Sequence, residues 1–131
     1  MNTNRLIQRA IQAREFAYSP YSKFPVGAAL KAGEGEIYTG ANVENGVNSL
    51  SICAERVALF NALSQGAREF EELAIACEGG PCRPCGSCRQ TLHEHAPELK
   101  IVMAELEGEC ETSPLTDLLP EPFEYRKKLD Q

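Results

Sequence analysis

Hydrophobic and polar positions along the chain follow a helical period first and a strand period afterwards. Near the N-terminus, apolar residues recur at the spacing of one helix face, and the pattern ends at Ser19-Pro20 because proline disfavours helical geometry in the residue before it. The residues on this face are Leu6, Ile7, Ala10, Ile11, Ala17 and Tyr18. We therefore expect a first helix that begins near Asn2 or Thr3.

A hairpin and a second helix are predicted next. The apolar segments 26–32 and 36–42 flank a Gly-Glu-Gly-Glu turn, which is typical of two paired strands. After a loop rich in Asn, Gly and Ser over 43–52, the segment 53–66 is apolar on most sides and ends in glycine. This pattern predicts a buried helix.

The second half of the chain continues the alternation. We expect strands over 72–77 and 100–106, a helix over 88–96 and a short helix over 113–119 that starts with a serine cap and a proline. Strands that alternate with helices predict an α/β sandwich around a mixed sheet.

Length and charge limit the possible functions. A chain of 131 residues is one domain, 1–131, and we expect the polar residues after about 124 to form a disordered tail. The 13 Lys and Arg against 19 Asp and Glu give a net charge of −6, which disfavours binding to nucleic acid or to a membrane surface. No apolar run approaches the roughly 20 residues of a membrane span, and the N-terminus lacks the apolar core of a signal peptide. We expect a cytoplasmic protein.

Cysteine usage indicates a metal site. The chain has six cysteines, which are Cys53, Cys77, Cys82, Cys85, Cys88 and Cys110. Three of them lie three residues apart, and clustered thiols in a reducing compartment are more often metal ligands than disulfide partners.

Two short segments combine thiols with helix starts. Cys53 opens one predicted helix and the run 84–88 opens another, and the N–H groups and dipole of a helix start favour the metal-binding thiolate. If the two helix starts lie side by side, Cys53, Cys85 and Cys88 can hold a zinc ion with one open position. Glu55 then lies where it can exchange protons with a metal-bound water. Spacing alone does not decide between the pairs Cys82/Cys85 and Cys85/Cys88.

Five stretches in this order show a family resemblance. They are YSKFPVGAAL, NVEN, CAER, PCGSCRQ and LLPEPF, and with them nearly the whole chain resembles the small zinc-dependent cytidine deaminases. The resemblance implies an αβα three-layer sandwich around a mixed sheet of about five strands, one zinc ion per subunit, and a homotetramer with sites shared between subunits. It also implies hydrolysis of cytidine and 2′-deoxycytidine to uridine, 2′-deoxyuridine and ammonia, a reaction of pyrimidine salvage.

The same resemblance assigns roles to individual residues. Cys53, Cys85 and Cys88 match the zinc ligands, Glu55 matches the proton shuttle, and Arg56 matches a residue that hydrogen-bonds the ligand sulfurs. Further residues match substrate contacts of the family. Asn42 and Glu44 match residues that bind the ribose, and Phe24 matches an aromatic residue that packs against the pyrimidine. The backbone of Ala54 and Pro84 matches contacts to the base edge, and Phe123 matches an aromatic residue that reaches the site of a neighbouring subunit.

Some features depart from the family pattern or allow other interpretations. Gly46-Val47-Asn48 stands where the family commonly has a tyrosine, so the preferred substrate stays open, with a modified nucleoside such as blasticidin S as the alternative. Cys82 is then a spare thiol beside the site. A non-enzymatic protein is the rival from another class, either an iron–sulfur carrier built on the C-x2-C-x2-C run or a structural zinc module.

Three further groups of residues are interpreted without a catalytic role. We expect Cys77 to pack in the core and Cys110 to lie in an exposed acidic loop. His93 and His95 are expected on a helix surface near its C-terminus, where positive charge suits the helix dipole, rather than at the metal.

Overall fold

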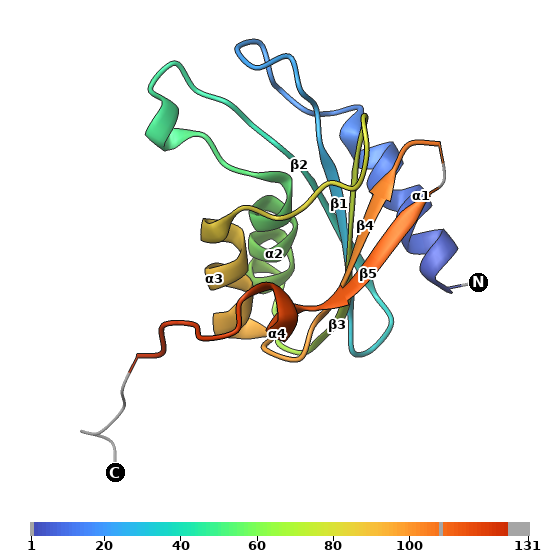
Figure 1. Cartoon of the computed structure of the whole chain (residues 1–131), viewed down its shortest axis with the longest axis vertical. Coiled ribbons are helices and arrows are strands. Elements are labelled where there is room, and N and C mark those ends of the chain that lie inside the picture. The colour runs from blue at the N-terminus through green and yellow to red at the C-terminus, as the bar shows by residue number, and fades with distance from the viewer. Residues whose placement is uncertain (1, 108, 126–131) are drawn as a thin grey trace.

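A five-stranded mixed sheet forms the centre of the computed structural model, which describes residues 2–107 and 109–125 (Figure 1). The sheet order is β2-β1-β3-β4-β5, and β3 and β4 are parallel whereas the other pairs are antiparallel. The strands are β1 (Gly27–Ala32), β2 (Ile37–Ala41), β3 (Phe70–Cys77), β4 (Lys100–Glu105) and β5 (Cys110–Pro114).

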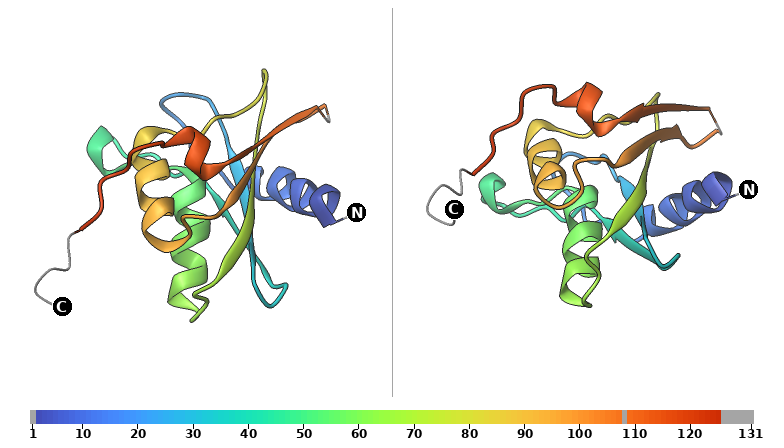
Figure 2. Two further views of the ribbon diagram at one scale, coloured as in Figure 1. Left: turned by 60° about the horizontal axis from the view of Figure 1, so that its bottom comes forward. Right: turned by 90° about the horizontal axis from the view of Figure 1, so that it is seen from below.

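Helices cover both faces of this sheet (Figure 2). They are α1 (Asn2–Arg14), the 3-10 turn η1 (Asn48–Leu50), α2 (Ala54–Ser64), α3 (Gly86–His95) and α4 (Leu115–Leu118). Helix α1 lies on one face, and α2 and α3 lie together on the other. Within the described residues, none of these helices has the length and apolar character that a membrane span requires.

Alternate residues of the strands pack into two separate hydrophobic cores, one on each face of the sheet. In β1, Ala28 and Leu30 pack with α2 and α3, while Ala29 between them packs against Leu6 and Ala10 of α1. This alternation follows from the strand period of two, which sends successive side chains to opposite faces. The predicted αβα three-layer sandwich around about five strands is confirmed.

The first helix is shorter than its hydrophobic pattern predicts. It ends at Arg14, so the prediction that Ala17 and Tyr18 continue its apolar face is wrong. Tyr18 is 57% exposed, and its backbone N–H donates to the Asn42 carbonyl, 2.9 Å away, in an isolated bridge with Val43. Backbone pairing with the segment after β2 thus replaces the last predicted helical turn.

A fifth strand lies where an acidic loop was expected. Cys110 is exposed as predicted, but it belongs to β5, which pairs with β4 at the sheet edge. Pro114 ends this strand and is the N-cap of the following helix, which therefore begins at Leu115 and not at Pro114 as predicted. Of the predicted disordered tail after about 124, the structure describes Tyr125, and 126–131 lie outside the described residues.

Gly40 lets β2 approach the start of α2. A Cβ atom at Gly40 would lie 2.4 Å from the Ala58 nitrogen and 2.8 Å from the Ala54 oxygen, which is backbone that cannot move aside cheaply. We expect Gly40→Ala to lower the free energy of unfolding by about 1–3 kcal/mol, because overpacking forces backbone shifts. Denaturant unfolding measures this. The matched control is Gly33→Ala, whose Cβ meets nothing closer than 3.4 Å; equal loss in both variants would contradict the prediction.

Candidate metal centre and substrate cavity

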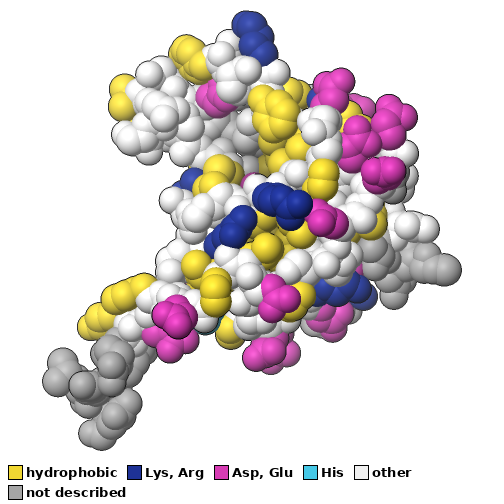
Figure 3. Space-filling model, in the orientation of Figure 1, with side chains coloured by type: hydrophobic (Ala, Val, Ile, Leu, Met, Phe, Trp, Pro, Cys, Tyr) yellow, Lys and Arg dark blue, Asp and Glu magenta, His cyan; other side chains and the backbone are white. Residues whose placement is uncertain are grey.

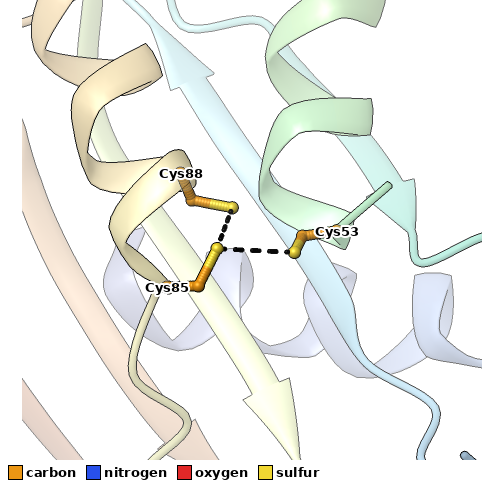
Figure 4. Close-up of side chains that lie close together, drawn as sticks. All are labelled: Cys53, Cys85 and Cys88. Carbon is orange, nitrogen blue, oxygen red and sulfur yellow. Dashed lines mark hydrogen bonds between the residues drawn. The ribbon is translucent and has the colours of Figure 1, made fainter. Parts of the chain in front are cut away.

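Three cysteines meet at the adjoining starts of α2 and α3. Cys53 is the N-cap of α2, Cys85 is the N-cap of α3, and Cys88 lies in the first turn of α3 (Figure 4). The sulfur atoms of Cys53 and Cys85 are 3.7 Å apart, and those of Cys85 and Cys88 are 3.5 Å apart. All three sulfurs lie within 4.8 Å of one another.

This spacing fits a tetrahedral zinc ion. Zn–S bonds of about 2.3 Å at tetrahedral angles place the sulfurs about 3.8 Å apart, close to the two measured separations. Three thiolates also leave the fourth position of such an ion open, which distinguishes a catalytic site from a closed structural one. The three cysteines therefore form a metal-binding site suited to zinc.

The structure separates Cys82 from this cluster. Among the described residues the metal-binding group comprises Cys53, Cys85 and Cys88, whose sulfurs lie within 4.8 Å of one another, and Cys82 is not part of it. Geometry thus favours the pair Cys85/Cys88 that the resemblance indicated over Cys82/Cys85.

Glu55 lies in the first turn of α2 and is 4% exposed. Burial raises the pKa of its carboxyl group to about 7, because the charged form loses its hydration. A carboxyl with a pKa near neutrality can both release and accept a proton under the same conditions. Glu55 also lines the cavity next to Cys53 and Cys85, so it can exchange protons with a molecule bound there.

Arg56 follows Glu55 and lies against the cysteine cluster. Its Nη2 atom is 3.7 Å from the Cys53 sulfur, and its Nε atom is buried with no hydrogen-bond partner among the described residues. Hydrogen bonding from Cys88 and from Arg56 lowers the pKa of the Cys53 thiol, which favours the thiolate. Arg56 therefore lies where the resemblance implies, beside a ligand sulfur.

We expect Arg56→Ala to lower turnover by about 10- to 100-fold, the usual effect of losing a group that supports metal ligands. Three thiolates around a divalent ion carry a net negative charge, and the guanidinium withdraws part of it from the sulfurs. The free energy of unfolding is expected to change by less than about 1 kcal/mol. Steady-state kinetics and thermal unfolding, with Arg56→Lys as the charge-retaining control, measure both effects. Unchanged turnover in Arg56→Ala would contradict the role.

A cavity of about 280 Å³ opens beside the cysteines. It brings together six residues that the sequence singled out, which are Phe24, Asn42, Cys53, Ala54, Glu55 and Cys85. In the space-filling view, the segment that contains η1 stands away from the body of the molecule and leaves a hollow (Figure 3).

Asn42 and Glu44 hold the loop that forms one wall of the cavity. The Asn42 side chain accepts from the Val26 N–H at 2.9 Å and donates to the Phe24 carbonyl at 3.1 Å. Glu44 accepts from the Tyr21 N–H at 2.9 Å, the Ser22 N–H at 3.1 Å and the Ser22 hydroxyl. The hydrogen bond from the Ser22 hydroxyl lowers the pKa of Glu44. Glu44 thus positions the loop and does not itself line the cavity.

Pro84 and Phe123 also lie apart from the cavity lining. Pro84 is fully buried, and its carbonyl oxygen accepts from Nε of Arg89 at 2.7 Å. Phe123 is 71% exposed beside the middle of α3, where its backbone pairs with Gln90.

Three residues of the cavity wall were missed by the sequence reasoning, namely Ser22, Val26 and Arg83, whereas Cys82 lies beside the site as predicted. For the first two a signal existed: Ser22, Phe24 and Val26 alternate, and alternate residues of an extended segment point the same way. No comparable pattern singles out Arg83, whose side chain reaches Glu111 of β5 at 2.7 Å.

The remaining polar candidates lie outside the site. Cys77 is 3% exposed at the end of β3, as predicted for a core residue. His93 pairs with Glu124, with 2.9 Å between Nε2 and Oε2, and His95 is exposed on the last turn of α3. Neither histidine belongs to the metal-binding group found among the described residues.

Comparison with known proteins agrees with the geometry. Residues 1–104 match the model of the cytidine and deoxycytidylate deaminase zinc-binding region. The chain is 46% identical to a cytidine deaminase of Sporosarcina psychrophila over 94% of this chain and 92% of the relative. It is 44% identical to a cytidine deaminase of Halalkalibacterium halodurans over 94% of this chain and 95% of the relative.

A solved structure shares the fold. The crystal structure of a cytidine deaminase from Burkholderia pseudomallei superimposes with a TM-score of 0.91 at 46% identity, covering 94% of this chain and all of that one. The family model covers most of the chain and includes the three clustered cysteines and Glu55. The chain therefore belongs to the cytidine deaminase family of zinc-binding hydrolytic deaminases.

Proposed function

We propose that this protein hydrolyses cytidine and 2′-deoxycytidine to uridine, 2′-deoxyuridine and ammonia. The observation that carries the proposal is the three-sulfur cluster with a buried glutamate beside it, both opening onto one cavity. A structural zinc module would have four ligands and would leave Glu55 buried without a purpose. The cluster of three cysteines also lacks the fourth cysteine of an iron–sulfur site.

The Glu55 carboxyl group transfers the protons in the proposed reaction. Cys53, Cys85 and Cys88 would hold a zinc ion, which would lower the pKa of a bound water towards about 7 and so supply the nucleophile for C4 of the cytosine ring. Glu55 accepts the proton that the water gives up and delivers it to ring nitrogen N3. It then takes the proton of the hydroxyl group on the tetrahedral C4 and passes it to the amine, so that the C4 carbonyl forms as the C4–N bond breaks and ammonia leaves. A pKa of about 7 suits this double role, because the carboxyl must act as base and acid in one turnover.

The cavity wall supports a nucleoside as substrate. We propose that the Phe24 ring packs against the pyrimidine and that the backbone of Ala54 contacts the base edge. Asn42 binds the ribose from the cavity wall. Glu44 and the backbone of Pro84, which lie outside the cavity lining of the free chain, are proposed to complete the ribose and base contacts. Asn42 already holds the backbone of Phe24, so a ribose bound to Asn42 would lie next to the ring that stacks on the base.

We further propose that the protein acts as a homotetramer in the cytoplasm and serves pyrimidine salvage. The exposed Phe123 ring fits a site shared between subunits, because it lies away from the cavity of its own chain. A net charge of −6 favours a free nucleoside over a polynucleotide.

A panel of substrates tests the proposal. Ammonia release from zinc-loaded protein is measured with cytidine, 2′-deoxycytidine, cytosine and blasticidin S in parallel. We expect turnover of the two plain nucleosides and little or none of free cytosine, because cytosine lacks the ribose that Asn42 and Glu44 would bind. Turnover of blasticidin S alone would show that the loop at Gly46–Asn48 has changed the substrate, and no turnover at all would contradict the enzymatic proposal.

A further inference from the structure

Side chains of α3 hold the C-terminal segment in place. Three residues on successive parts of the helix contact it: Arg89 donates to the Leu118 carbonyl at 2.7 Å, Gln90 pairs with Phe123, and His93 pairs with Glu124. Figure 2 shows the segment after α4 running along α3 in both views. The described residues after 118 form no helix or strand. The hydrogen bonds from α3 side chains therefore hold this segment in place of backbone pairing.

The Gln90 side chain forms two hydrogen bonds with the backbone of one residue, Phe123. Its Nε2 atom donates to the Phe123 carbonyl at 2.8 Å, and its Oε1 atom accepts from the Phe123 N–H at 3.2 Å. A side-chain amide that meets both backbone groups of one residue imitates a neighbouring strand and restricts that residue's position. These two hydrogen bonds hold Phe123 by its backbone.

The ring of Phe123 stays largely exposed on its own chain, in a surface pocket that it lines together with His93 and Pro97. It is 71% exposed and does not line the cavity that holds Glu55. Exposing an aromatic ring to water forgoes the stabilisation that burial would give. A fixed backbone with an exposed ring therefore presents the ring to another molecule.

We propose that Gln90 is a positioning residue that holds Phe123 so that its ring completes the substrate cavity of a second copy of this chain. The inference rests on the proposed function, in which subunits share their sites. Gln90 lies two residues after Cys88, on the same helix as two of the clustered cysteines. Helix α3 thereby positions two cysteines of its own metal cluster and, through Gln90, the Phe123 ring that reaches the neighbouring chain.

Gln90→Met tests this, because methionine keeps the length of the side chain and removes both hydrogen bonds. We expect faster hydrogen exchange at the Phe123 amide, unchanged zinc content, kcat within twofold and KM for cytidine raised about fivefold, the size of one lost ordinary hydrogen bond. Phe123→Ala is expected to raise KM at least as much. The double variant should match Phe123→Ala, since Gln90 acts only through Phe123. Gln8→Met on the exposed face of α1 is the matched control.

Self-association gives a readout that does not need activity. Sedimentation at decreasing concentration should show earlier dissociation in Gln90→Met and Phe123→Ala, and no further weakening in the double variant. Additive effects of the two changes, an unchanged Phe123 exchange rate, or a wild-type chain that stays monomeric would each overturn the positioning role. A wild type that assembles and responds in this way yet releases no ammonia would instead overturn the proposed function alone.

Discussion

Glu55→Gln is expected to lower turnover of cytidine by at least about 10³-fold while the protein keeps its zinc and its fold. Glutamine has nearly the same shape as the buried carboxyl but can neither accept the proton of the attacking water nor deliver one to the ring. Because the side chain is 4% exposed, no other acid from solvent can readily replace it.

The measurement is steady-state ammonia release together with zinc content and circular dichroism of the same sample. Glu94→Gln serves as the matched control, since Glu94 is an exposed helical glutamate on α3. Loss of zinc from Glu55→Gln would make Glu55 a ligand instead of a proton carrier, and turnover within tenfold of wild type would remove it from the mechanism.

Cys85→Ser is expected to lose both zinc and activity, whereas Cys82→Ser keeps them. Cys85 lies between the other two sulfurs, 3.7 Å from that of Cys53 and 3.5 Å from that of Cys88, so its loss leaves two ligands. A serine hydroxyl is a much poorer zinc ligand than a thiolate, because it stays protonated near neutral pH. Cys82 shares the loop and the three-residue spacing but lies outside the metal-binding group found among the described residues.

Zinc per chain, measured by atomic emission after exhaustive dialysis, separates the two variants. We expect about one zinc ion per chain in the wild type and in Cys82→Ser, and almost none in Cys85→Ser or Cys88→Ser. Loss of zinc from Cys82→Ser with retention in Cys88→Ser would reverse the ligand assignment.

Much of the fold follows from local patterns in the sequence. The small apolar residues of β1 and the apolar run of β3 specify buried strands, and both lie where expected. β5 could not be found this way, because its residues Cys110–Pro114 are mostly exposed and polar, without the alternation of a half-buried strand. Its pairing with β4 is a tertiary effect. The early end of α1 has the same origin, since backbone pairing of Tyr18 overrides helical spacing.

The functional site, like the fold, was predictable from the sequence only in part. The two helix starts that carry Cys53 and Cys85 could be read from the chain, but only their meeting in space, across 32 positions of sequence, makes a metal site. Spacing left Cys82 and Cys88 equivalent, and the fold separates them. The loop-holding contacts of Glu44 were not predictable, because they depend on where the segment 21–22 folds back.

The central claim is that the cysteine cluster and Glu55 together deaminate a cytosine nucleoside. Uridine formation from cytidine, followed in metal-free protein as zinc is added back in known amounts, tests it most directly. We predict that the rate rises in proportion to bound zinc and stops rising at about one ion per chain. A rate that does not depend on bound zinc, or fully zinc-loaded protein that forms no uridine, would contradict the account.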